Sequence, residues 1–281
     1  MSKKKKVLFA FILLTFGVVV FLLTRTPSHG RNWNEYHALL PNATVTPQLV
    51  TLYNVRDWQY GVAEPTSKES LEKVELDPRE IVSVWFVLEP FAKFDAVGHS
   101  FLSFEFSDGE AYSFSIEARG EVGEYYSTLA GIFPKYELIY AWGTERDFIM
   151  RRLLMLDHPV HFYKLELSKE DSTGLFMAVA EATAELAKRP RFYNTLTANC
   201  TNMLAKIINN KYPGKVPYDI SWNLPGFSDA FLFKQGLITS QYSFEALRER
   251  SLLVPFKKEL EQAAASSTLM FNQKVREVVA E

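Results

Sequence analysis

Hydrophobic and polar residues alternate along several short segments in the middle of the chain. Alternation with a period of two predicts strands that bury one face. The segment Ile81–Pro90, "IVSVWFVLEP", is a near-continuous apolar run with β-branched residues, which favours a strand buried on both faces. The predicted strands cover residues 50–61, 81–90, 98–106, 110–118, 136–143 and 160–167.

Helical patterns follow the strands toward the C-terminus. Asp171–Pro190 has an acidic cap and a proline stop, and a second helix begins near Cys200 and ends at about Asn210. Residues 145–156 and most of 243–281 also have helical patterns, whereas the charged segment 64–80 predicts a loop with a short helix. The sequence therefore predicts an α+β domain, an antiparallel sheet with helices packed on it.

The loop Ser107–Gly109 between two predicted strands fixes their register. A two-residue turn would mismatch the apolar faces, whereas a three-residue loop with a left-handed glycine pairs Phe104 with Tyr112. The same register places His99 opposite Glu117 on the other face. We expect that face to form a groove in which the helix of the cysteine docks.

The N-terminus departs from this pattern. Four lysines, Lys3–Lys6, precede an uncharged run from Val7 to Thr24, whose 18 residues are near the lower limit for a membrane-spanning helix. The lysines should stay in the cytoplasm, so the remainder would lie outside it. A cleaved signal peptide is the competing interpretation, with Ser28–Gly30 as a weak cleavage site. Both interpretations imply export of the domain.

Composition narrows the choice of partners. The chain has 281 residues, of which 47% are hydrophobic and 23% charged, values that suit one large globular domain with a packed core. Its formal net charge is -2 at pH 7. Because there is no basic excess, nucleic acid is not an expected partner.

Cys200 is the one cysteine of the chain and cannot form an internal disulfide. In an exported protein an odd cysteine indicates an intermolecular bond or a free thiol with a role. The alternative is a small buried hydrophobe. Asn199 is a good helix cap, so the thiol should lie in the first turn of a helix, where the partial positive charge lowers a thiol pKa.

A thiol nucleophile needs a nearby base, usually a histidine. His29 and His37 lie in the polar segment after the apolar run, and His158 with His161 forms an H-P-V-H pair without a carboxylate cluster, so no metal site is predicted. His99 begins a strand that is otherwise patterned for a core. A facing carboxylate would orient this histidine, although a plain surface ion pair is the alternative.

Five ordered blocks, "NVRDWQYG", "GHSFLSFEF", "SIEARGEVGEYYS", "YELIYAWGTERD" and "RFYNTLTANCT", together resemble the Lnb N-terminal periplasmic domain family, from about Asn54 to Thr201. A strand histidine followed by a helix-start Asn-Cys also resembles the permuted papain-like enzymes, among them lecithin:retinol acyltransferase. The resemblance implies a permuted papain-like fold and a thiol acyltransferase. The Lnb family is linked to N-acylation of bacterial lipoproteins.

These observations lead to one expected organisation. The predicted segments are a basic cytoplasmic tail (1–6), a transmembrane anchor (7–24), a tether (25–48), a periplasmic catalytic domain (49–240) and a C-terminal helical extension (241–281). We expect a single-pass protein of the bacterial inner membrane whose partners are the membrane and a lipid or lipoprotein substrate.

The expected activity is a cysteine acyltransferase or lipid acyl hydrolase that works through an acyl-thioester and needs no cofactor. A cysteine peptidase or cell-wall amidase is the first alternative, and a non-enzymatic envelope protein is the second. The predicted catalytic residues are Cys200, His99 and Glu117, and the predicted substrate-binding residues are Arg119, Tyr193, Asn194 and Asn199.

Overall fold

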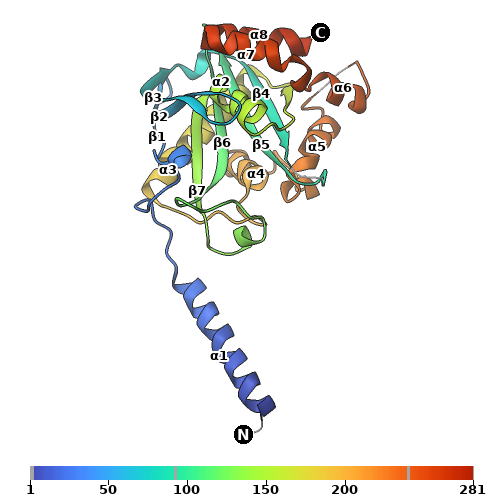
Figure 1. The fold of residues 1–281 in the computed structure, drawn as a ribbon. Helices are drawn as coiled ribbons and strands as arrows, with labels where there is room; N and C mark the ends of the chain where they lie inside the picture. The colour runs from blue at the N-terminus through green and yellow to red at the C-terminus, as the bar shows by residue number, and fades with distance from the viewer. Residues whose placement is uncertain (1–2, 92–93, 239–240, 281) are drawn as a thin grey trace.

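The computed structural model describes residues 3–91, 94–238 and 241–280 (Figure 1). The strands are β1 (Asn42–Val45), β2 (Val50–Tyr60), β3 (Pro65–Leu76), β4 (Ile81–Pro90), β5 (Gly98–Phe106), β6 (Ala111–Arg119), β7 (Glu137–Thr144) and β8 (His161–Lys164). The α-helices are α1 (Lys3–Thr24), α2 (Glu145–Met150), α3 (Lys169–Lys188), α4 (Cys200–Lys211), α5 (Ser228–Lys234), α6 (Phe244–Arg250), α7 (Lys257–Ser266) and α8 (Thr268–Ala280). A π-helix, Arg151–Met155, continues α2.

One large sheet organises the described residues. Its strand order is β1-β2-β7-β6-β5-β4-β8, and β3 pairs with β2. The predicted α+β class is confirmed. Neighbouring strands are antiparallel as predicted, with the exception of β2 and β7, which run parallel where Arg56 pairs with Gly143.

The predicted β5–β6 register is confirmed from Phe101↔Ser115 to Glu105↔Ala111, whereas His99 and Glu117 lie beyond the paired residues. Phe104 pairs with Tyr112 and Leu102 with Phe114. Gly109 has φ +86°, the left-handed conformation that the three-residue loop requires. The parity of the loop therefore decides which side chains reach the core, because a shift of one residue would turn every side chain to the other face.

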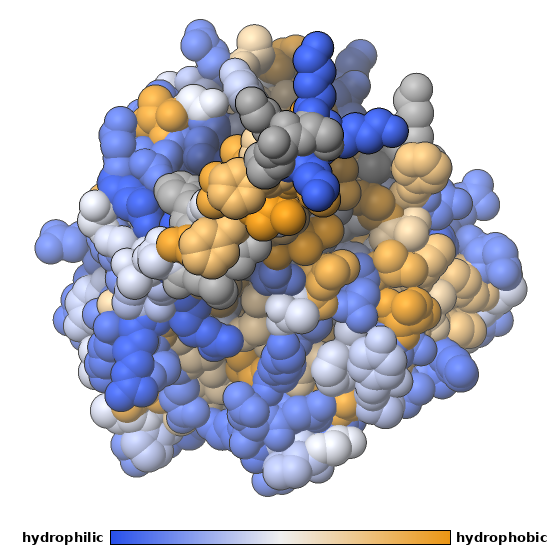
Figure 2. Space-filling view, turned by 90° about the horizontal axis from the view of Figure 1, so that it is seen from below, coloured by the Kyte–Doolittle hydropathy of each residue, from blue (hydrophilic) through white to orange (hydrophobic). Residues whose placement is uncertain are grey.

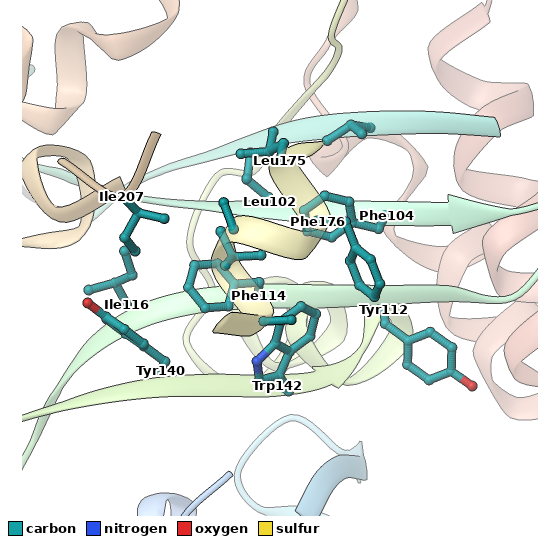
Figure 3. Close-up of a cluster of buried hydrophobic side chains, with 14 of the residues drawn as sticks. Leu102, Phe104, Tyr112, Phe114, Ile116, Tyr140, Trp142, Leu175, Phe176 and Ile207 are labelled. Atoms are coloured by element: carbon teal, nitrogen blue, oxygen red, sulfur yellow. The ribbon is translucent and has the colours of Figure 1, made fainter. Parts of the chain in front are cut away.

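The apolar face of the sheet is covered by α3 and α4 (Figure 3). Phe104 and Phe114 of the sheet pack with Phe176 of α3, and Ile207 of α4 joins the same cluster. The helix that begins at Cys200 thus packs on the apolar face. Our expectation that it docks in a groove on the opposite face is wrong, because Met203 and Ile207 give α4 an apolar side of its own to bury.

The opposite face carries a second core. α2, the π-helix and the C-terminal helices α7 and α8 cover it, and α7 and α8 lie together at one end of the domain (Figure 1). Phe101 of β5 and Phe148 of α2 pack with tilted rings at a centroid distance of 5.4 Å, and Phe271 of α8 is fully buried. The sheet is therefore enclosed on both sides.

The segment 64–80 differs from its prediction. Residues Pro65–Leu76 form the 12-residue strand β3, which pairs with β2 from Val50↔Leu76 to Tyr60↔Pro65, and a short 3-10 helix follows at Pro78–Glu80. The many Glu and Lys side chains of β3 favour a helix or loop locally, but an exposed strand tolerates charges, and pairing along β2 outweighs the local preference.

The N-terminal helix α1 extends away from the domain in Figure 1, and Figure 2 views the molecule from the side on which it lies. The sequence predicts a membrane-spanning helix over 7–24, but no helix within the described residues has the length and apolar content needed to cross a membrane. Residues 1–2 of the predicted tail and the predicted boundary at 240 lie outside the described residues.

Residues 25–48, for which a tether is predicted, lie against the domain. Arg31 Nε is 2.6 Å from Glu137 Oε1, and Trp33 is buried. The segment also contributes β1, which pairs with β2. The chain between α1 and the sheet is therefore part of the folded structure.

Candidate active site

Cys200 is the first residue of α4, as the sequence predicts. The Asn199 side chain accepts a hydrogen bond from the Asn202 N–H at 2.9 Å, and the Asn202 side chain accepts one from the Asn199 N–H at 3.0 Å. This reciprocal capping fixes the helix start. The Asn199 amide also donates to the Thr195 and Trp222 carbonyl oxygens, which holds the buried thiol at a defined place.

His99 lies at the start of β5 and hydrogen-bonds the Cys200 thiol. Its Nε2 is 2.7 Å from the Ser115 hydroxyl oxygen and 3.8 Å from Glu117 Oε1. Because Nε2 is engaged by these two groups, Nδ1 is the ring nitrogen left for the thiol. The structure thus brings together the three residues predicted as catalytic.

The thiol reaches this histidine where β5 and β6 separate. The paired residues of the two strands end at Phe101 opposite Ser115. If the pairing continued, the Ser100 N–H would donate a hydrogen bond to the Ile116 carbonyl oxygen. This N–H instead donates to the Cys200 sulfur. The open end of the sheet therefore provides both a space for the sulfur and a backbone donor for its thiolate.

The electrostatics of the pair favour charge separation. Burial alone would raise the pKa of the Cys200 thiol, but the hydrogen bond and charge of His99, together with the Ser100 N–H and the Thr201 hydroxyl, lower this pKa to about 7. Burial alone would lower the pKa of His99, but Cys200 and the charge of Glu117 raise it. Both shifts stabilise a thiolate beside an imidazolium.

Glu117 stays ionised despite its burial. Burial would raise its pKa, but a hydrogen bond from His37 and the charges of His37, His99 and Arg152 hold that pKa well below its ordinary value. His37 Nε2 is 2.8 Å from Glu117 Oε2, and Arg152 Nη2 is 3.6 Å from Oε1. The carboxylate is therefore fixed by neighbours on more than one side.

Glu89 of β4 is a second buried carboxylate and lies opposite His99 of β5 in the sheet. Its two oxygens lie 2.6 Å from Arg152 Nε and 2.6 Å from His158 Nδ1. Burial would raise the pKa of Glu89, but the charge of Arg152 and the hydrogen bond from His158 lower it to about 2. Arg152 thus joins the two carboxylates of the site.

The thiol–imidazole pair opens into a cleft of about 430 Å³ with a predominantly apolar lining. Tyr193 and Asn199, two of the predicted substrate-binding residues, line this cleft. A larger cavity of about 600 Å³ lies elsewhere, between Trp85, Tyr163 and Arg276, and neither residue of the pair lines it. We assign the candidate site to the smaller cleft because the reactive groups face it.

The other two predicted substrate-binding residues do not line the cleft. Arg119 is 1% exposed, and its guanidinium donates to the carbonyl oxygens of His37 and Ala38 at 2.9 Å each. Asn194 donates to the Ile132 carbonyl oxygen at 2.7 Å and caps the turn that follows it. Arg119 therefore holds the segment that presents His37 to Glu117.

Sequence reasoning missed most of the groups that surround the pair. The sequence places His37 in the predicted tether and gives it no role in the site, and Arg152 and Glu89 have no local signal. The backbone N–H of Ser100 is a feature that no residue type reveals. Ser115 alone had a signal, because the hairpin register places it on the face of His99.

The fold and the site together define a class of protein: a mixed α+β domain with a buried thiol–imidazole pair in an apolar cleft. The chain belongs to the Lnb N-terminal periplasmic domain family, which matches residues 67–224, more than half of the chain. This membership supports a periplasmic location and a role in the cell envelope. No curated protein and no solved structure matched the chain.

Proposed function

We propose that the domain is a cysteine acyltransferase or lipid acyl hydrolase that works through an acyl-thioester on Cys200. The observation that carries the proposal is the Cys200–His99 pair, whose thiol pKa is lowered to about 7 beside an apolar cleft. A substrate with an acyl chain, such as a membrane lipid or a lipoprotein, fits the apolar lining.

In the first step the Cys200 thiolate attacks the ester carbonyl carbon and forms a C–S bond. The C–O bond to the alcohol breaks, and the alcohol leaves with the proton of the His99 imidazolium. In the second step His99 removes a proton from water, an amine or a hydroxyl group, which attacks the thioester. The C–S bond breaks, and the thiolate–imidazolium pair is restored.

The developing oxyanion needs hydrogen-bond donors. The first turn of α4 presents N–H groups that have no partner within the helix, and the N–H of Ser100 lies beside the sulfur. Glu117 orients His99 and stabilises its charged form. The order of a strand histidine before a helix-start cysteine supports a relation to the permuted papain-like enzymes.

Amide hydrolysis, as in a peptidase or cell-wall amidase, is the second candidate. The raised pKa of His99 favours it, because an amine leaving group requires a proton from the imidazolium. The two candidates differ in the acyl group that would remain on the sulfur.

We further propose that α1 holds the domain at a bacterial inner membrane. Phe11, Leu14 and Phe16 of this helix are each more than half exposed, and neither of the two apolar cores among the described residues includes them. Fractionation of cells that express the full chain and a chain without residues 3–24 tests this role. Recovery of both in the same fraction would argue against it.

The deciding experiment is intact-mass spectrometry of the full chain purified from membranes. We expect a hydroxylamine-sensitive adduct of fatty-acyl mass on Cys200, and its absence from Cys200→Ser. Thiol and hydroxyl are similar in size, so the serine variant should keep its melting temperature and lose turnover. Full turnover by the serine variant on lipid esters would exclude the thiol mechanism, and release of peptides from cell wall would favour the amidase.

A further inference from the structure

The π-helix Arg151–Met155 brings two consecutive arginines to the cleft. π-Helical turns are rare and frequent at functional sites. Arg152 is bound by two carboxylates, but Arg151 is not. Its guanidinium carbon lies 3.8 Å from the centroid of the Tyr36 ring, and its buried Nε has no hydrogen-bond partner in the part of the chain that the structure describes.

The acids around the cleft are already engaged. Glu89 and Glu117 line it, and each is bound by at least two cationic or histidine side chains. Asp147 is paired with Arg56, and Glu124 faces a lysine and accepts a backbone hydrogen bond. Arg151 is therefore a partly buried cation in the cleft whose acidic neighbours are committed elsewhere, and a buried charge without a partner is costly.

Arg151 also lies at a junction between two cavities. A side pocket of about 140 Å³ shares Arg151, His37, Ala118 and Tyr126 with the cleft. An anionic group in the side pocket would contact the guanidinium while an attached acyl chain lies in the apolar cleft. Glu124 also lines the side pocket, but its carboxylate accepts the Glu121 N–H and lies 3.7 Å from Lys135 Nζ, so Arg151 is the group there that an anion would contact.

We propose that Arg151 binds the phosphate group of a phospholipid whose ester carbonyl is presented to Cys200. A guanidinium suits this group because its planar donors match two phosphate oxygens. The assignment rests on the proposed function for the identity of the reacting ester. The sequence predicts Arg119 as a substrate-binding residue, but Arg119 binds carbonyl oxygens and does not line the cleft, and Arg152 is paired with carboxylates, which leaves Arg151 for the anion.

Protection of the thiol measures this binding without requiring turnover. The full chain in detergent is treated with iodoacetamide at pH 7, and the alkylated fraction is followed by intact mass in the presence of decyl phosphate, decanol or inorganic phosphate. We expect decyl phosphate to protect Cys200 at roughly tenfold or more lower concentration than decanol. A stronger effect than that of inorganic phosphate would identify a lipid headgroup as the source of the anion.

Three variants separate charge from packing. Arg151→Gln should reduce the advantage of decyl phosphate about tenfold or more, and Arg151→Lys should keep part of it. Arg250→Gln is the matched control, because Arg250 also stacks on a tyrosine, Tyr242, but lines the larger cavity. In Arg250→Gln, decyl phosphate should protect Cys200 as well as it does in the wild type. If Arg151→Gln does not fold, Arg151→Lys still tests whether the paired donors of the guanidinium are needed.

Equal protection by decanol and decyl phosphate would overturn the proposal, as would unchanged protection in Arg151→Gln. Equal protection by inorganic and decyl phosphate would support the anion site and reject the phospholipid. The proposed acyl transfer fails separately: absence of any acyl adduct on Cys200, with protection that still depends on Arg151, would leave the anion site intact.

Discussion

At the scale of single residues, the site is a chain of charge-assisted contacts. Cys200 is bound by His99, His99 by Ser115 and Glu117, and Glu117 by His37. Each contact fixes the orientation of the next ring or carboxylate. The charge on the sulfur therefore depends on groups beyond the histidine that it contacts.

The first residue-scale prediction concerns the pH dependence of Cys200. Alkylation by iodoacetamide should follow the thiolate fraction, with a midpoint near the thiol pKa of about 7. In His99→Ala the thiol stays buried, which raises its pKa, but it loses the histidine that lowers this pKa most. The midpoint of alkylation should therefore move above the ordinary thiol pKa of about 8.5. The rate at pH 7 should fall roughly 5- to 10-fold, since a more basic thiolate is also more nucleophilic. An unchanged midpoint in the variant would show that His99 does not activate the thiol.

The second prediction concerns His37. His37→Phe keeps the ring volume but removes the N–H that binds Glu117, so the pKa of Glu117 should rise. Turnover should fall about tenfold with little change in KM, and the acidic limb of the pH profile should move to higher pH. His37→Gln keeps a donor and should restore much of the loss. A uniform loss with an unmoved acidic limb would point to a purely structural role.

At the scale of elements, the walls of the cleft approach each other closely. The Gly226 N–H donates to the Ala96 carbonyl oxygen at 3.1 Å. A Cβ added at Gly226 would lie 1.8 Å from the Asp95 carbonyl oxygen, so one backbone segment would have to move. Gly226 thus joins the loop before β5 to the short 3-10 turn Pro225–Phe227, both of which contribute cleft residues.

The third prediction follows from this contact. Gly226→Ala should displace the cleft wall, lower turnover about tenfold or more and destabilise the fold by about 1–3 kcal/mol. Gly30→Ala is the control, because its added Cβ would meet only the Ser28 hydroxyl oxygen at 3.8 Å. Thermal unfolding and turnover of both variants give the comparison. Full activity of Gly226→Ala would mean that the wall adapts without consequence.

The elements also show where sequence reasoning is reliable. The β5–β6 register was predictable because loop parity and the apolar face agree on one answer. The strand β3 was not predictable, because its exposed charged residues show no apolar alternation and the strand forms only by pairing with β2. A buried face is visible in a sequence, whereas a backbone ladder at an exposed strand is not.

At the scale of the whole molecule, the C-terminal helices complete the second core. Phe271 of α8 is fully buried, and Arg276 of the same helix pairs with Glu145 of α2 and lies 3.2 Å from Glu105 of β5. The last 40 residues therefore support the sheet face that carries His99 and Glu117. The candidate site depends on both ends of the chain, since His37 comes from the N-terminal segment.

The fourth prediction tests this support. Phe271→Ala should destabilise the fold by about 3–5 kcal/mol, the range for a large buried aromatic side chain. Leu269→Ala, two residues earlier and 46% exposed, should change stability by about 0.5 kcal/mol or less. Denaturant unfolding of the two variants gives the difference. Equal small effects would mean that α8 is not part of the cooperative core.

The predicted catalytic set could be assembled from sequence because each member had a local signal: a lone cysteine at a helix start, a histidine at a strand start and a carboxylate in register with it. His37 and Arg152 are distant from these positions in sequence and come close only through packing, and Glu89 reaches His99 through the pairing of β4 with β5. Their contribution is tertiary, so neither spacing nor periodicity indicates it.

The separation of β5 and β6 has a consequence for the life of the newly made chain. His99 and the Ser100 N–H come from a strand that is about one hundred residues from Cys200, so an unfolded chain carries an ordinary, slowly reacting cysteine. The fast-reacting thiol exists only after His99 and the Ser100 N–H have come into contact with it. During refolding, rapid alkylation should therefore appear only in molecules in which β5 and α4 have come together, and it should report their yield.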